Sequence, residues 1–105
     1  MKKFEVNVNG NTYLLEYNRA SFVALEEAGF NVLGADLRDK PYSAIYKCLK
    51  EGLKINHGNL SNEEKEAIVD AILNDYELGD LIEVTVEIIQ SFFIQGENKK
   101  KVVRR

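Results

Sequence analysis

The chain of 105 residues is poor in the residues that build disulfides, metal sites and many active sites: it has no tryptophan and one each of cysteine, histidine and proline. A single cysteine excludes an internal disulfide and fits a reducing compartment. No apolar run approaches the roughly 20 residues of a membrane-spanning helix. Lys2 and Lys3 precede an alternating segment rather than the apolar core of a signal peptide. We therefore expect a cytoplasmic protein without a membrane partner.

Signatures of catalysis are equally scarce. His57 lies between Asn56 and Gly58 in a polar segment, where a surface histidine at a helix end is expected. Cys48 falls within an amphipathic pattern and is expected to be a small buried hydrophobe, because no basic partner is placed to activate its thiol. The glycines form neither a phosphate loop nor a dinucleotide fingerprint, and no ligand spacing suits a metal. The sequence thus predicts a protein that is not an enzyme and has no cofactor.

The opening residues form the clearest local pattern. Phe4–Val8 and Thr12–Tyr17 are short runs in which apolar and polar residues alternate, and Asn9-Gly10 lies between them. An Asn-Gly pair in this position predicts a type I′ turn, since both central residues of that turn need a positive φ. We expect a two-stranded hairpin over residues 3–17. Two strands alone are marginal in water, so a helix or a second subunit must cover them.

Helix signals follow the hairpin. Asn18 and Gly29 fit the N-cap and the C-terminal glycine of a helix near residues 19–28, which is the nearest candidate to cover the hairpin. After a connector, Asp39 fits the N-cap of a helix near 40–54, with Pro41 in its first turn. One face of that helix carries apolar residues at three- and four-residue steps, namely Tyr42, Ile45, Tyr46, Leu49 and Leu53. Its other side carries Lys47, Lys50, Glu51 and Lys54.

Two capping boxes predict the last two helices. Ser61 with Glu64 opens a helix near 62–76, and Asp80 with Glu83 opens one near 80–95. The first of these helices is expected to turn inward Ala67, Ile68, Ala71, Ile72 and Tyr76.

The segment Leu81–Ile94 is the most apolar part of the chain, with nine apolar residues among fourteen. Its length favours a helix, although its β-branched residues leave a strand as an alternative. A face this broad suits either a central core helix or a surface left available to another chain.

These patterns predict an α+β fold with an N-terminal hairpin and a body of about four helices, forming one domain over residues 1–96. Residues 97–105 are expected to be a basic disordered tail. They hold five basic residues and one acidic residue, so the net charge of −3 divides into +4 there and −7 in the rest of the chain.

The segments Val8–Tyr13 and Leu25–Gly29 resemble the start of small tail assembly chaperones of long-tailed phages and prophages of Gram-positive bacteria. Proteins of that group often open with a ribbon around an N-G turn, a tyrosine-rich strand and a helix ending in L-E-x-x-G. The resemblance implies a non-enzymatic factor that binds the tape-measure protein during tail assembly. It leaves contact with the tail-tube protein open and implies self-association into homo-oligomers.

For such a factor, the expected interaction residues are apolar or aromatic, namely Tyr42, Tyr46, Ile82, Ile89, Phe92 and Phe93. The alternative is a small regulator or nucleic-acid-binding module that acts through its tail. Contact with a polyanion would then come from Lys99, Lys100, Lys101, Arg104 and Arg105. The acidic body argues against nucleic acid, because a duplex-binding domain normally presents a basic face.

Overall fold

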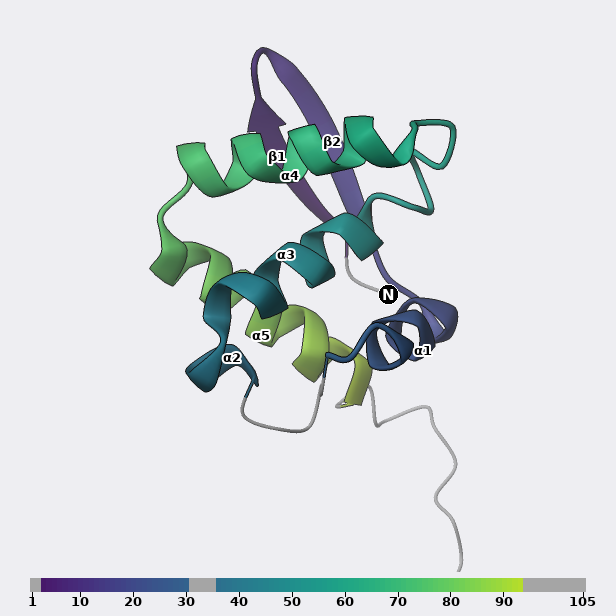
Figure 1. Cartoon of the computed structure of the whole chain (residues 1–105), viewed down its shortest axis with the longest axis vertical. Coiled ribbons are helices and arrows are strands. Elements are labelled where there is room, and N and C mark those ends of the chain that lie inside the picture. The colour runs from purple at the N-terminus through teal and green to yellow at the C-terminus, as the bar shows by residue number, and fades with distance from the viewer. Residues whose placement is uncertain (1–2, 31–35, 94–105) are drawn as a thin grey trace, which may run out of the picture.

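The computed structural model describes residues 3–30 and 36–93, except for the side chains of residues 36–37 and 91–93. It confirms the predicted α+β fold, in which a two-stranded antiparallel hairpin precedes a helical body (Figure 1). The elements in order are β1 (Lys3–Val8), β2 (Asn11–Glu16), α1 (Arg19–Glu27), α2 (Asp36–Asp39), α3 (Pro41–Gly52), α4 (Asn62–Asp75) and α5 (Leu78–Phe93).

The hairpin turn has the predicted conformation. Asn9 has a φ of 52° and Gly10 a φ of 78°, and Val8 pairs with Asn11 across the turn. Two positive φ values in a two-residue loop define the type I′ turn, whose twist matches that of the strands. A signal of two residues therefore fixes the register of the whole hairpin.

Side chains from the helical body occupy both edges of this hairpin. In an antiparallel hairpin, hydrogen-bonded residue pairs alternate with pairs that are not hydrogen-bonded to each other. Asn7 and Leu14 belong to pairs of the second kind, so their backbone amides point away from the partner strand. The Asn7 amide donates to the Tyr76 hydroxyl over 3.0 Å. On the other edge, the Leu14 amide donates to Nε2 of His57, also over 3.0 Å. Each edge thus has one outward amide satisfied by a side chain.

The predicted cover of the hairpin was wrong. α4 packs against β1 and α3 packs against β2, whereas α1 packs against α3. α1 lies beyond the end of the hairpin, on the far side of α3 from α4 (Figure 1). Sequence proximity suggested α1, but the direct connection from β2 into α1 carries that helix away from the strands.

Both ends of α1 are formed as predicted. Asn18 caps the helix, because its side chain accepts from the Ser21 amide at 2.9 Å and its own amide donates to the Ser21 hydroxyl at 3.0 Å. Gly29 has a φ of 93°, and the Phe30 amide donates to the Leu25 carbonyl at 2.9 Å. This is a Schellman motif, and its two apolar residues, Leu25 and Phe30, are buried.

The start of α3 differs from the prediction. Residues expected to form a connector include a four-residue helix, α2, and Asp39 is its last residue. Asp39 pairs with Arg38 at 3.0 Å instead of capping α3, and Lys40, at the N-cap position, makes no side-chain capping bond. Pro41 begins α3 as predicted, since the first helical position needs no amide hydrogen.

α3 is the central helix of the fold. It packs against α1, α2, α4, α5 and β2, so of the two alternatives for the last helix, that of a central core helix was wrong. Its buried residues are Ala44, Ile45, Cys48, Leu49 and Gly52, and Leu53 follows at its C-cap. Cys48 is buried as predicted. Tyr42, expected on the same inward face, is 61% exposed, because it lies in the first turn of the helix.

The Ser61–Glu64 capping box of α4 is confirmed, with hydrogen bonds of 3.1 and 3.0 Å in the two directions. Most of the predicted inward face of α4 is confirmed, since Ile72 is buried and Ile68, Ala71 and Tyr76 pack against the core. The exceptions are Ala67, which is exposed, and Val69, which is buried although it was not predicted. The chain places the β-branched residues against the core, where their larger apolar area stabilises more than that of alanine.

α5 is a helix, so the alternative of a strand was wrong. It begins at Leu78, which places Asp80 in the first turn rather than at the N-cap. Leu81, Thr85 and Ile88 are buried along one side, and the Thr85 hydroxyl donates to the Leu81 carbonyl over 2.8 Å. Neither α5 nor any other helix in the described part of the chain is long and apolar enough to cross a membrane.

Tyr17 connects the end of the hairpin to α3. Its side chain is 2% exposed, and its hydroxyl donates to the Cys48 carbonyl over 2.7 Å. One turn further along α3, Gly52 leaves the space that the tyrosine ring fills, because a Cβ on Gly52 would collide with that ring. The absence of a side chain at Gly52 is therefore what lets Tyr17 enter the core.

Candidate functional site

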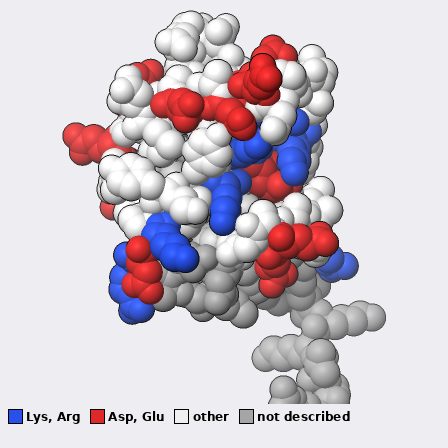
Figure 2. Space-filling view, in the orientation of Figure 1, with Lys and Arg blue, Asp and Glu red and all other residues white. Residues whose placement is uncertain are grey.

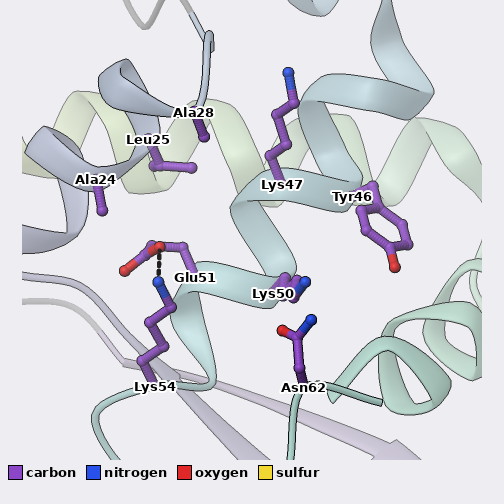
Figure 3. Close-up of a pocket in the computed structure, with 9 residues that line it drawn as sticks. All are labelled: Ala24, Leu25, Ala28, Tyr46, Lys47, Lys50, Glu51, Lys54 and Asn62. Atoms are coloured by element: carbon purple, nitrogen blue, oxygen red, sulfur yellow. Dashed lines mark ion pairs between the residues drawn. The ribbon is translucent and has the colours of Figure 1, made fainter. Parts of the chain in front are cut away.

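A groove of about 330 Å³ lies between α1, α3 and the start of α4. Small and apolar side chains at α1 form its floor, and Lys47 and Lys50 of α3 line it together with Lys54, which follows that helix (Figure 3). We call it the lysine groove, and its lining residues are Ala24, Leu25, Ala28, Tyr46, Lys47, Lys50, Glu51, Lys54 and Asn62.

Two lysines of the groove lie on α3, and the third, Lys54, lies in the turn that follows the C-cap residue Leu53. Lys47 and Lys50 are spaced at i and i+3, which brings helical side chains close together on one face. Lys54 Nζ lies 2.8 Å from a carboxylate oxygen of Glu51 (Figure 3). Lys50 Nζ lies 3.5 Å from a carboxylate oxygen of Glu66 on α4. Both pairs are partly exposed, so each is worth on the order of 0–1 kcal/mol.

Lys47 differs from its two neighbours. Within the described residues, no carboxylate lies within ion-pair distance of its ammonium group. Its Nζ atom lies beside the last turn of α1, 3.7 Å from where a Cβ of Gly29 would stand. A cation is favourable there, because the carbonyl groups at a helix C-terminus carry partial negative charge.

Basic side chains gather near the middle of this face of the molecule. Figure 2 shows acidic side chains above and below them, and also one acidic group between the basic side chains on the right. Among the residues that line the lysine groove, three are cationic and one is anionic. The groove is thus locally positive in a chain with a net charge of −3.

Tyr46 also lines the groove and is half-buried. Desolvation raises the pKa of its hydroxyl, and the carboxylates of Glu66 and Asp70 on α4 raise it further. The hydroxyl therefore stays protonated and can donate a hydrogen bond to an incoming acceptor. Tyr42, one turn earlier, is largely exposed and is not among the lining residues.

The other predicted interaction residues lie on α5. Ile82 and Ile89 are half-buried and pack against the edge of the core. They lie on a different helix from Tyr42 and Tyr46, and the predicted set is therefore not one patch. The side chains of Phe92 and Phe93 lie outside the described residues, as do the tail residues Lys99, Lys100, Lys101, Arg104 and Arg105.

A smaller hollow of about 120 Å³ lies where α5 faces the sheet. Phe4 and Val6 of β1 line it from one side, and Leu81 and Val84 of α5 line it from the other. The hollow shows that this part of the interface between β1 and α5 is incompletely filled. It lies next to the apolar surface of α5 that the sequence indicated as a contact surface.

The sequence interpretation missed two features of the site. The sequence placed Lys47, Lys50 and Lys54 on the side of the helix away from its apolar residues, and the structure brings all three into the lining of one groove between α1, α3 and α4. Their close spacing in the sequence is the signal that marks a local excess of positive charge. His57 was expected at the surface, but it is half-buried, with its ring edge-on to Tyr13 at a centroid distance of 5.3 Å.

No group of three His, Cys, Asp or Glu side chains in residues 3–30 and 36–93 is arranged to hold a metal ion. The thiol of Cys48 is buried, and burial raises its pKa to about 12. The described residues bring contact area and charge together in the lysine groove, and partly exposed apolar area along α5.

A family model described as a domain of unknown function, DUF5055, matches residues 1–104, and the chain belongs to that family. No curated protein and no solved structure matches the chain.

Proposed function

We propose that this protein is a non-enzymatic assembly chaperone of a long-tailed phage or prophage. It binds the tape-measure protein in the cytoplasm of the bacterial host while the tail is built. The physical role is reversible coverage of apolar surface on the client, which needs no cofactor. Contact with the tail-tube protein and self-association belong to the same proposal.

The observation that carries the proposal is an apolar row along α5. Ile82, Val86 and Ile89 recur at i, i+4 and i+7 and are all half-buried. The neighbouring row of Leu81 and Ile88 forms the buried side of the same helix, whereas Ile82 and Ile89 pack against the edge of the core and stay partly exposed. A partly exposed apolar row beside a buried one can supply the contact area that binds another chain.

The resemblance of the opening residues gives the proposal its particular client. Its motifs coincide with structural elements, since Asn9-Gly10 forms the hairpin turn and Gly29 ends α1. These residues support the fold rather than touch a client. The client contact is assigned to α5 on the physical argument of the preceding paragraph.

Co-expression tests the proposal. The client is the very long coiled-coil protein encoded beside this one, where the genome has one. The two proteins are produced together, and the soluble fraction of the client is measured. We expect the protein to keep the client soluble and to co-purify with it. A genome without such a gene nearby, or a client equally soluble alone, would refute the proposal.

A pair of adjacent substitutions isolates the α5 row. Ile89→Asp introduces a charge into the row, whereas Gln90→Asp introduces the same charge at an exposed neighbouring position. We expect Ile89→Asp to lose the client and Gln90→Asp to retain it. Circular dichroism confirms that both variants are folded, and Ile82→Gln, a milder change in the same row, serves if Ile89→Asp does not fold.

A further inference from the structure

We propose that the lysine groove docks an acidic amphipathic helix of a partner protein. This site shares no residue with the α5 row, so it goes beyond the proposed chaperone function and stands independently of it. The inference rests on the shape of the groove, the spacing of its lysines and the state of their ion pairs.

The spacing of the lysines sets the length of the partner segment. From Lys47 to Gly52 the groove follows α3 for five residues, or about 8 Å at 1.5 Å per residue, and Lys54 follows in the turn after the helix. A partner helix lying along α3 presents side chains at i and i+3 on one face, the spacing of Lys47 and Lys50, and at i+7 one turn further along. Carboxylates at the first two positions would face Lys47 and Lys50, and one at the third would lie toward the turn that carries Lys54.

The ion pairs within the chain leave the lysines available. Lys47 has no carboxylate partner within the described residues, and Lys50 and Lys54 are held by partly exposed pairs at 3.5 and 2.8 Å. Such pairs contribute little to stability, so exchanging them for carboxylates of a partner costs little. Lys47 gains most, since it has no pair to give up.

The floor of the groove selects a peptide over a small anion. Ala24, Leu25 and Ala28 line it, and alanines spaced at i and i+4 allow the backbone or an apolar side chain of a partner to approach α1 closely. An apolar side chain between the carboxylates of the partner would bury area there. A phosphate ion has no group to place on that floor.

The surroundings of the groove disfavour nucleic acid. α4 flanks the groove and carries Glu63, Glu66 and Asp70, and Figure 2 shows acidic side chains on both sides of the basic strip. A duplex is wider than this strip and would bring its phosphates against those carboxylates. A single helix lies within the strip and avoids them.

Fluorescence anisotropy with the full chain tests the inference. The probe is a labelled alanine-based peptide of about 20 residues, long enough to be helical, with Glu at i, i+3 and i+7 and Leu between them. The control peptide has the same composition with the glutamates spread around the helix. We expect the first peptide to bind more tightly than the second and to weaken as salt is added, because salt screens exposed charges.

Two charge reversals on the protein locate the site. Lys47→Glu replaces attraction by repulsion in the groove, and we expect peptide affinity to fall about tenfold. Lys40→Glu makes the same change at an exposed position that does not line the groove, and affinity should stay within about twofold. If Lys47→Glu does not fold, Ala28→Gln fills the groove from α1 without a change of charge and should also weaken binding.

Each remaining outcome overturns the inference. Equal affinity for the two peptides, or equal loss in Lys47→Glu and Lys40→Glu, would show that the contact is non-specific charge attraction. If inorganic phosphate or duplex DNA, at the same concentration of negative charge as the peptide, displaced the peptide, the groove would be a general anion site. Sedimentation tests whether the groove binds a second copy of this chain instead. Concentration-dependent association that Lys47→Glu abolishes, together with no binding of the peptide, would show that it does.

Discussion

The glycine in the last turn of α3 gives a sharp test of how the hairpin is anchored to the helices. Gly52 is buried and helical, and a Cβ added there would collide with the hydroxyl and ring of Tyr17. The tyrosine cannot easily move aside, because its hydroxyl is bonded to the Cys48 carbonyl at 2.7 Å in the core. Gly52→Ala should therefore destabilise the protein.

Opposing effects set the magnitude. Alanine gains up to about 1 kcal/mol over glycine inside an unobstructed helix. Overpacking a filled core costs about 1–3 kcal/mol, and displacing a buried hydroxyl from its acceptor costs about 1–3 kcal/mol more. The steric and hydrogen-bond costs outweigh the helix preference, and we expect the free energy of unfolding to fall by about 2 kcal/mol.

Gly79 provides the matched control. It also lies in a helix, α5, but a Cβ at that position meets nothing within 4 Å. Gly79→Ala should therefore raise the free energy of unfolding by about 0.5 kcal/mol. Urea unfolding followed by far-UV circular dichroism and tyrosine fluorescence measures both variants, and the absence of tryptophan leaves the tyrosine emission unobscured.

Two results would refute the reasoning. One is a Gly52→Ala variant as stable as the natural protein, which would mean that no close contact exists. The other is strict additivity with Tyr17→Phe. Since Tyr17→Phe removes the hydroxyl, the nearest colliding atom, the double variant should be less destabilised than the sum of the two single changes.

Three other contacts give further predictions. His57→Ala removes the hydrogen-bond acceptor of the Leu14 amide. We expect hydrogen exchange at that amide to accelerate about fivefold, which corresponds to a loss of about 1 kcal/mol. An exchange rate that NMR finds unchanged would contradict this. Hydrogen bonds from the Ser61 amide, and then from its hydroxyl, hold the pKa of Glu64 below its ordinary value of 4.5. The ionised carboxylate therefore stabilises the folded state at pH values above 4.5. This stabilisation is lost as the pH falls through the lower pKa that Glu64 has in the folded state. The difference in melting temperature between the natural protein and Glu64→Gln should therefore vanish in acid, and a difference that persists there would contradict the assignment. Burial raises the pKa of Cys48 to about 12. A thiol reagent at about pH 8 should therefore label the native protein no faster than the protein unfolds around this thiol. Rapid labelling of the folded protein would count against a buried thiol.

Local signals in the sequence predicted the elements that depend on neighbouring residues. The Asn9-Gly10 turn, the Asn18 cap, the glycine at position 29 and the Ser61–Glu64 box each involve residues at most three apart, together with a conformational requirement that few residue types meet. These features need no knowledge of the rest of the fold. They accounted for the hairpin, for both ends of α1 and for the start of α4.

Features that depend on distant residues were not predictable in this way. Asp39 and Asp80 have the chemistry of N-caps, but the helices begin at other positions because α2 and the first turn of α5 include them. Which helix is central depends on how all five pack, and the apolar composition of α5 wrongly favoured it over α3. The lysine groove likewise exists only because α1 packs beside α3, and no local pattern encodes that contact.

The two outward amides of the hairpin bear on how this protein can misassemble. Tyr76 and His57 hold those amides at 3.0 Å, so a strand from another molecule cannot extend the sheet at either position until one of the side chains swings away. The growth rate of cross-β aggregates through the hairpin would then be limited by the release of a hairpin edge within each molecule, rather than by collisions between molecules. Early aggregation rates should accordingly depend less on protein concentration than on changes, such as His57→Ala, that release the edge.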